Sequence, residues 1–132
     1  MKAIYKLTLL VSILWLSLGV AKAQSPEVVL DQVTRSLTNP RAVDQIGQYF
    51  EDRVEISLLG KRQAYSRTQA QYVLGQFVAD YGIGRFNLIQ KGQTSDTIYA
   101  VGECQTAGGN VEVNIFIRLS SGRVSEMQFE RR

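Results

Sequence analysis

The feature that most constrains the fold is a helix signal followed by a strand signal between Tyr65 and Gly92. Ser66 and Gln69 have the spacing of a capping box, in which each side chain satisfies a backbone N–H group at a helix N-terminus. Apolar residues then recur at helical spacing, at Ala70, Val73, Leu74, Phe77, Val78 and Tyr81. The pattern predicts an amphipathic helix that begins near Arg67 and packs one face against a sheet, and either Gly82 or Gly84 can supply the left-handed residue that ends it.

Four strands are expected after this helix. Alternation of Phe86, Leu88 and Gln90 with their neighbours predicts the first of them and places these three side chains on one face. Three more strands are expected over residues 97–106, 111–119 and 123–129. Their connections are short and rich in turn-forming residues, so this half of the chain is predicted to be an antiparallel meander.

Two helices and two strands are expected before the organising helix. Ser25 and Asn39 each precede a proline, a pair typical of a helix start. A half-buried strand over residues 54–58 and a short strand ending at Tyr65 follow. The predicted order is ααββαββββ, an α+β fold in which three helices pack on a strongly curved, cone-shaped antiparallel sheet of about six strands.

The N-terminus reads as a secretory signal peptide over residues 1–23. Lys2 and Lys6 precede an apolar run over residues 7–20, and Ala21-Lys22-Ala23 forms a small-x-small cleavage site. A membrane anchor is the alternative, but the apolar run is shorter than the roughly 20 residues that a spanning helix needs. We therefore expect a cleaved, exported protein, periplasmic or extracellular and free of the membrane, with a single domain over residues 24–132.

Cleavage changes the charge balance. The chain has 15 basic and 12 acidic residues, and three of the basic residues but none of the acidic ones lie within residues 1–23. The mature chain therefore carries no net charge. Because nucleic-acid binding depends on an excess of basic residues, no nucleic-acid partner is expected.

Two missing or rare residue types exclude several chemistries. The chain contains no histidine, which is the commonest general base and metal ligand. Its single cysteine excludes an internal disulfide and the usual zinc sites. Cys104 shares a strand face with small and apolar residues, so it is interpreted as buried, with a reactive thiol as the alternative. We expect no metal site, no cofactor and no catalytic residue.

The element order, with the segments 65–70, 86–92 and 113–118, resembles a family of small exported bacterial proteins known as a domain of unknown function. That family belongs to the nuclear transport factor 2-like superfamily, also called SnoaL-like or cystatin-like. The resemblance covers nearly all of the mature chain. It implies the cone-shaped fold but leaves the function open, because the superfamily hosts enzymes, binding modules and oligomerisation domains.

Two groups of residues are candidates for a functional site. Seven aromatic residues would either line an apolar pocket for a small ligand or complete the core: Tyr49, Phe50, Tyr65, Tyr72, Phe77, Tyr81 and Phe86. A second group is expected on the outer sheet face, as an interface for a homodimer: Tyr99, Val101, Glu103, Phe116 and Arg118.

The favoured interpretation is a non-catalytic module for small-ligand binding or assembly. The alternative is a cofactor-free isomerase or dehydratase that uses a carboxylate and a tyrosine inside the cone. Strand alternation argues against this alternative, because Tyr99 and Glu103 face away from the core and Glu55 opposes its apolar neighbours.

Overall fold

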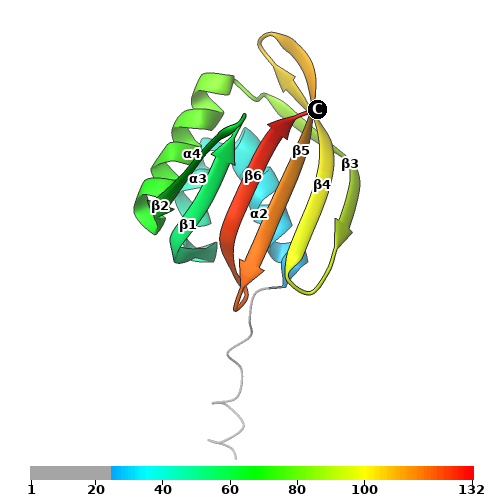
Figure 1. The fold of residues 1–132 in the computed structure, drawn as a ribbon. Helices are drawn as coiled ribbons and strands as arrows, with labels where there is room; N and C mark the ends of the chain where they lie inside the picture. Colours follow the sequence, from blue (N-terminus) through cyan, green and yellow to red (C-terminus); the bar gives the residue numbers. More distant parts are fainter. Residues whose placement is uncertain (1–24) are drawn as a thin grey trace, which may run out of the picture.

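The computed structural model describes residues 25–132, in which three helices cover one face of a six-stranded sheet (Figure 1). The predicted signal peptide lies outside the described residues. The helices are α2 (Pro26–Thr38), α3 (Pro40–Ile46), which continues into a 3₁₀ turn (Gly47–Tyr49), and α4 (Arg67–Tyr81). The strands are β1 (Phe50–Leu58), β2 (Lys61–Ser66), β3 (Arg85–Gln93), β4 (Thr97–Thr106), β5 (Gly109–Ser120) and β6 (Arg123–Arg131). This order confirms the predicted one.

Both ends of α4 form as the sequence indicates. The Ser66 hydroxyl accepts a hydrogen bond from the Gln69 backbone N–H at 3.3 Å, and the Gln69 side chain accepts one from the Ser66 N–H at 3.2 Å. Gly82 ends the helix in the left-handed conformation with φ of 67°, where a side chain would be strained. The buried stripe of α4 consists of Ala70, Leu74 and Val78.

Two buried polar side chains join α2 to α3. The Gln32 amide and the Ser36 hydroxyl both donate to the Ala42 carbonyl oxygen, at 3.2 and 3.3 Å. These bonds satisfy groups that would otherwise be costly to bury. They fix the two helices as a pair at the N-terminal end of the described chain.

The strands lie in the order β2-β1-β6-β5-β4-β3, with the predicted antiparallel meander from β3 to β6. One pair departs from the all-antiparallel expectation, because β1 and β6 run parallel, with Ile56 opposite Met127. The reason is that alternation predicts which face a residue occupies but not the direction of the neighbouring strand. The sheet is therefore mixed.

A second correction concerns the face of β3. Phe86 lies opposite Cys104 and Leu88 opposite Gly102, but Lys91 instead of Gln90 is the residue opposite Ala100. A bulge at residue 89 inserts one extra residue and shifts the register, which simple alternation cannot anticipate. The bulge thus brings a lysine onto the face that carries Phe86 and Leu88.

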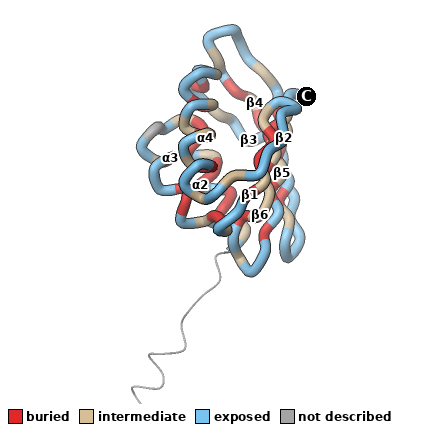
Figure 2. The backbone as a smooth tube through the Cα atoms, turned by 60° about the vertical axis from the view of Figure 1, so that its left-hand side comes forward, coloured by how far each residue is buried: buried red, intermediate tan, exposed pale blue. Residues whose placement is uncertain are grey.

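Buried residues concentrate between the helical layer and the sheet (Figure 2). The largest side chains that are fully buried there include Phe50, Ile56, Ile115 and Ile117. The opposite face of the sheet, turned to the viewer in Figure 1, carries no helix. It is called the outer face below.

Candidate functional site

The interior of the cone is filled with side chains. The enclosed cavity between the helices and the sheet measures about 20 Å³, and it is lined by apolar residues and Ser36. A space of this size holds about one water molecule. The buried polar side chains of the described chain are Gln32, Ser36 and Ser57, and all three are hydrogen-bonded.

The structure does not gather the seven aromatic pocket candidates around one cavity. Phe50 is fully buried in the core, and Tyr49, Tyr65, Phe77, Tyr81 and Phe86 pack partly buried against it. Phe77 and Tyr81 form an aromatic cluster with Phe129, with ring centroids 5.1 to 6.1 Å apart. These six residues therefore pack into or against the core, and Phe86 also lines the groove between α2 and β3 that is described below.

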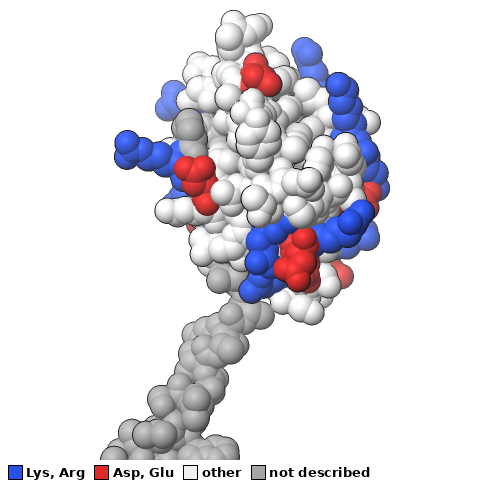
Figure 3. Space-filling model, turned by 90° about the vertical axis from the view of Figure 1, so that its left-hand side faces the viewer, with Lys and Arg blue, Asp and Glu red and all other residues white. Residues whose placement is uncertain are grey.

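The seventh candidate, Tyr72, lies on the outside of α4 and is 68 % exposed. Figure 3 views this side of the molecule, where charged side chains gather toward the edges and the middle of the face is largely uncharged. Tyr72 lines two shallow surface hollows, one against α3 and one against β2. It contributes nothing to the interior.

Reactive groups are scarce in the described part of the chain. Cys104 is fully buried, and burial raises the pKa of its thiol from the ordinary 9.0 to about 11, which keeps it protonated and unreactive at neutral pH. Within residues 25–132, no group of three or more His, Cys, Asp or Glu side chains is placed to hold a metal ion. No helix of the described residues is long and apolar enough to cross a membrane.

The five interface candidates all lie on the outer face, on β4 and β5. Tyr99 lies opposite Phe116 in the antiparallel pairing, Val101 opposite Asn114, and Glu103 opposite Glu112. Tyr99 is 43 % exposed, whereas Val101 is only 2 % exposed because its neighbours cover it. The centre of this face is thus apolar and aromatic.

Charged side chains flank this centre at both ends. At one end Arg118 lies 3.5 Å from Glu126, and its guanidinium also lies over the Phe116 ring at 5.8 Å. At the other end Glu103 and Glu112 face each other directly, which is unfavourable for like charges. Arg132 relieves part of this repulsion through a 2.7 Å contact with Glu112.

A buried polar atom lies between these two ends. The Asn114 side-chain oxygen is the one buried side-chain polar atom in residues 25–132 that has no hydrogen-bond partner. An unsatisfied buried acceptor typically costs about 1 to 3 kcal/mol. The side chains around this atom cover it, so the cost belongs to the packing of the outer face itself.

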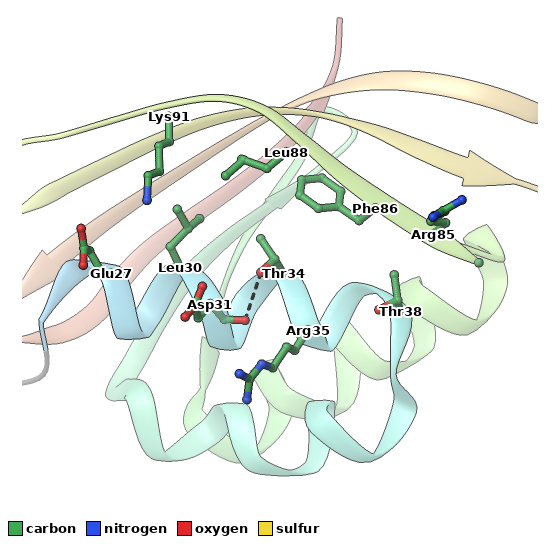
Figure 4. A pocket seen from close by; sticks show the side chains of 11 residues that line it. Glu27, Leu30, Asp31, Thr34, Arg35, Thr38, Arg85, Phe86, Leu88 and Lys91 are labelled. Atoms are coloured by element: carbon green, nitrogen blue, oxygen red, sulfur yellow. Dashed lines mark hydrogen bonds between the residues drawn. The ribbon is translucent and has the colours of Figure 1, made fainter.

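A groove of about 490 Å³ separates α2 from β3 (Figure 4). Its apolar floor consists of Leu30 from the helix with Phe86 and Leu88 from the strand, whose side chains point toward α2. Leu88 is 45 % exposed, an unusual exposure for a leucine on the inner face of a sheet. The groove remains open because β3 lies at the edge of the sheet and only α2 covers it.

Charges divide the groove into two ends. Glu27, Asp31 and Lys91 line one end and Arg85 lines the other, whereas the Arg35 guanidinium points away from β3 and toward α3. None of these five side chains forms an ion pair with another residue between 25 and 132. Sequence reasoning missed the groove, because the bulge that brings Lys91 to this face leaves no clear mark in the hydrophobic pattern.

Comparison with known proteins identifies the fold and a family. The sequence model of the family described as Domain of unknown function (DUF4783) matches residues 30–130. The solved structure of a DUF4783 family protein from Bacteroides uniformis is similar with a TM-score of 0.62 and 19 % identity, over 77 % of this chain and 95 % of that protein. No curated protein matches the chain.

Two further solved structures extend the likeness. An NTF2-like protein of unknown function from Cytophaga hutchinsonii has a TM-score of 0.64 at 4 % identity, over 86 % of this chain and 95 % of that one. A SnoaL-like family protein from Agrobacterium tumefaciens has a TM-score of 0.65 at 10 % identity, over 80 % of this chain and 95 % of that one. The fold is thus the nuclear transport factor 2-like α+β fold, as expected. Sequence identities this low establish a shared fold and not a shared function.

Proposed function

This chain belongs to the DUF4783 family of domains of unknown function, and we propose that it is an exported, non-catalytic assembly module that pairs with a second copy of itself. The observation that carries the proposal is the uncovered outer face, with Tyr99 and Phe116 side by side at its centre. Exposed aromatic residues that lie over a buried apolar layer are typical centres of protein interfaces.

The charge pattern of β5 supports pairing about a two-fold axis. Its outward side chains read Glu112, Asn114, Phe116 and Arg118 along the strand, from acid to base. In a two-fold pair the same patch meets itself in reverse, so the acidic end of one copy lies against Arg118 of the other. Arg118 of the partner subunit would compensate the Glu103–Glu112 repulsion.

The filled interior supports a non-catalytic role. Inside the cone, the polar side chains described are Gln32 and Ser36, which already hydrogen-bond to backbone oxygens. Neither supplies the carboxylate that proton transfer within this pocket would need. A cavity of about 20 Å³ also leaves no room for a small ligand.

Export rests on the sequence of residues 1–23, which carries the charged, apolar and cleavage regions of a signal peptide. The mature chain is neutral and has no pair of cysteines that could form a disulfide, so its stability must come from the packed core. A domain of 109 residues after cleavage is large enough for such a core.

Native mass spectrometry of the protein purified from an exporting bacterial host tests the proposal. The expected spectrum shows a dimer whose subunits begin at Gln24 and carry no added mass. At about 100 μM even a specific pair of weak affinity would form dimers, so a protein that stays monomeric up to this concentration would contradict assembly. Subunits that retain residues 1–23 would contradict signal cleavage.

A further inference from the structure

We infer that the groove between α2 and β3 binds the extended carboxyl-terminal segment of a partner polypeptide, which adds a strand to the free edge of β3. This inference concerns a surface separate from the outer face and goes beyond self-pairing. A helix beside a free strand edge offers two kinds of contact to such a segment. The strand provides backbone hydrogen bonds, and the groove accepts alternate side chains.

The free edge of β3 is long and open. β3 is the last strand of the sheet and spans nine residues, of which only Phe86 is partly buried. In an edge strand, the backbone N–H and C=O groups that point away from the sheet have no strand partner. The bulge at residue 89 interrupts this edge, so the regular segment available for pairing is Arg85 to Leu88.

The groove beside this edge suits apolar side chains. Leu30, Phe86 and Leu88 form its floor, and its volume of about 490 Å³ lies within the range of sites that bind peptides or small molecules. Successive side chains of a strand point to opposite sides, so every second residue of the added strand would enter the groove. We therefore expect apolar residues at alternate positions of the bound segment.

The charges determine the direction of the added strand. β3 runs from the Arg85 end of the groove to the Lys91 end, so an antiparallel segment ends beside Arg85. A free carboxylate there lies beside the Arg85 guanidinium, which has no acidic partner among the described residues. A parallel segment would instead place its carboxylate beside Glu27 and Asp31, whose two negative charges outweigh the one positive charge of Lys91 at that end. The charges thus favour an antiparallel strand with a free carboxyl end.

The test is selection from a library of random hexapeptides with free carboxyl ends, using the mature protein as the target. The expected result is enrichment of peptides with apolar residues at alternate positions near the carboxyl end. Amidation of a selected peptide should weaken binding roughly tenfold or more, because the charge-assisted contact is lost. The bound peptide should also slow hydrogen exchange of backbone amides in Arg85–Leu88.

Matched variants locate the site. Leu88→Asp should weaken binding roughly tenfold or more. Ile89→Asp should change it less than about twofold, since Ile89 is 58 % exposed against 45 % for Leu88 but does not line the groove. Circular dichroism verifies that both variants are folded.

Three results would overturn the inference. The first is a library without enriched peptides, and the second is binding that Leu88→Asp and amidation leave unchanged. The third is a change in the subunit count of the Leu88→Asp variant, which would assign the groove to a second copy of the chain instead of a peptide. An intact dimer that binds no peptide leaves the proposed function standing, so the two failures are distinguishable.

Discussion

The packing of Phe86 on Gly102 leads to a quantitative prediction. A Cβ atom added at Gly102 would overlap two ring carbons of Phe86 and would lie 3.1 Å from the Asn87 carbonyl oxygen. Ordinary contacts between carbon atoms are about 3.5 to 4.0 Å, so the ring would have to move by more than about 1 Å. Gly102→Ala should therefore lower the free energy of unfolding by about 1 to 3 kcal/mol, the usual cost of overpacking.

Urea unfolding followed by circular dichroism measures this change. The tryptophan of the chain lies at residue 15, within the predicted signal peptide, so tryptophan fluorescence is no probe of the mature protein. Gly92→Ala is the matched control, because a Cβ atom there meets nothing within 4 Å. This control should be neutral or slightly stabilising, by up to about 0.5 kcal/mol, since alanine restricts the unfolded chain more than glycine does.

A double-mutant cycle separates the clash from other effects. In a Phe86→Leu background the ring is absent and only the 3.1 Å contact with the Asn87 carbonyl oxygen remains, so Gly102→Ala should cost clearly less than in the wild type and the two substitutions should be non-additive. Additive effects, or a Gly102→Ala variant as stable as the wild type, would refute the packing described for this face of β3 and β4.

Two further predictions concern the core. Phe77→Ala should lower the free energy of unfolding by about 3 kcal/mol in the same urea assay, because the ring packs edge-on against Phe129 at 5.1 Å; a loss below about 1 kcal/mol would show that α4 packs otherwise. Burial raises the pKa of Cys104 from 9.0 to about 11, so below pH 9 both states hold the proton, and between pH 9 and 11 only the unfolded thiol ionises. Stability should then fall by up to about 1.4 kcal/mol per pH unit over that window, and an equal slope in Cys104→Ala would contradict the buried thiol.

Local signals in the sequence predicted the helices and strands well. The capping pair Ser66 and Gln69 sets the start of α4 and Gly82 its end, because these residues satisfy or free backbone groups locally. The strand predicted over residues 97–106 is β4 as observed, because polar turns bound its alternating pattern on both sides. Such signals depend only on neighbours along the chain.

The features that escaped prediction depend on partners distant in sequence. The parallel pairing of β1 with β6 depends on where the last strand of the meander is placed in the sheet, and no local sequence pattern determines that position. The bulge that turns Lys91 inward depends on the fit of β3 to β4. Aromatic residues posed a similar difficulty, since an apolar side chain such as Phe77 gives the same sequence pattern whether it fills a core or lines a pocket.

The interface candidates were placed on the correct face by alternation alone, but their contacts were not predictable. Arg118 already pairs with Glu126 and lies over Phe116, while Val101 is covered by its neighbours. These contacts follow from the cross-strand register. Only Tyr99 remains as a large exposed side chain at the centre of the patch.

Sedimentation equilibrium of matched tyrosine variants tests the proposed assembly most directly. Tyr99→Glu puts a charge at the centre of the outer face, whereas Tyr72→Glu puts the same charge on α4, where the tyrosine is even more exposed. We predict that the wild type and Tyr72→Glu are dimers and that Tyr99→Glu is a monomer, or dissociates at least tenfold more readily. A Tyr99→Glu variant that dimerises as tightly as Tyr72→Glu would contradict pairing through the outer face.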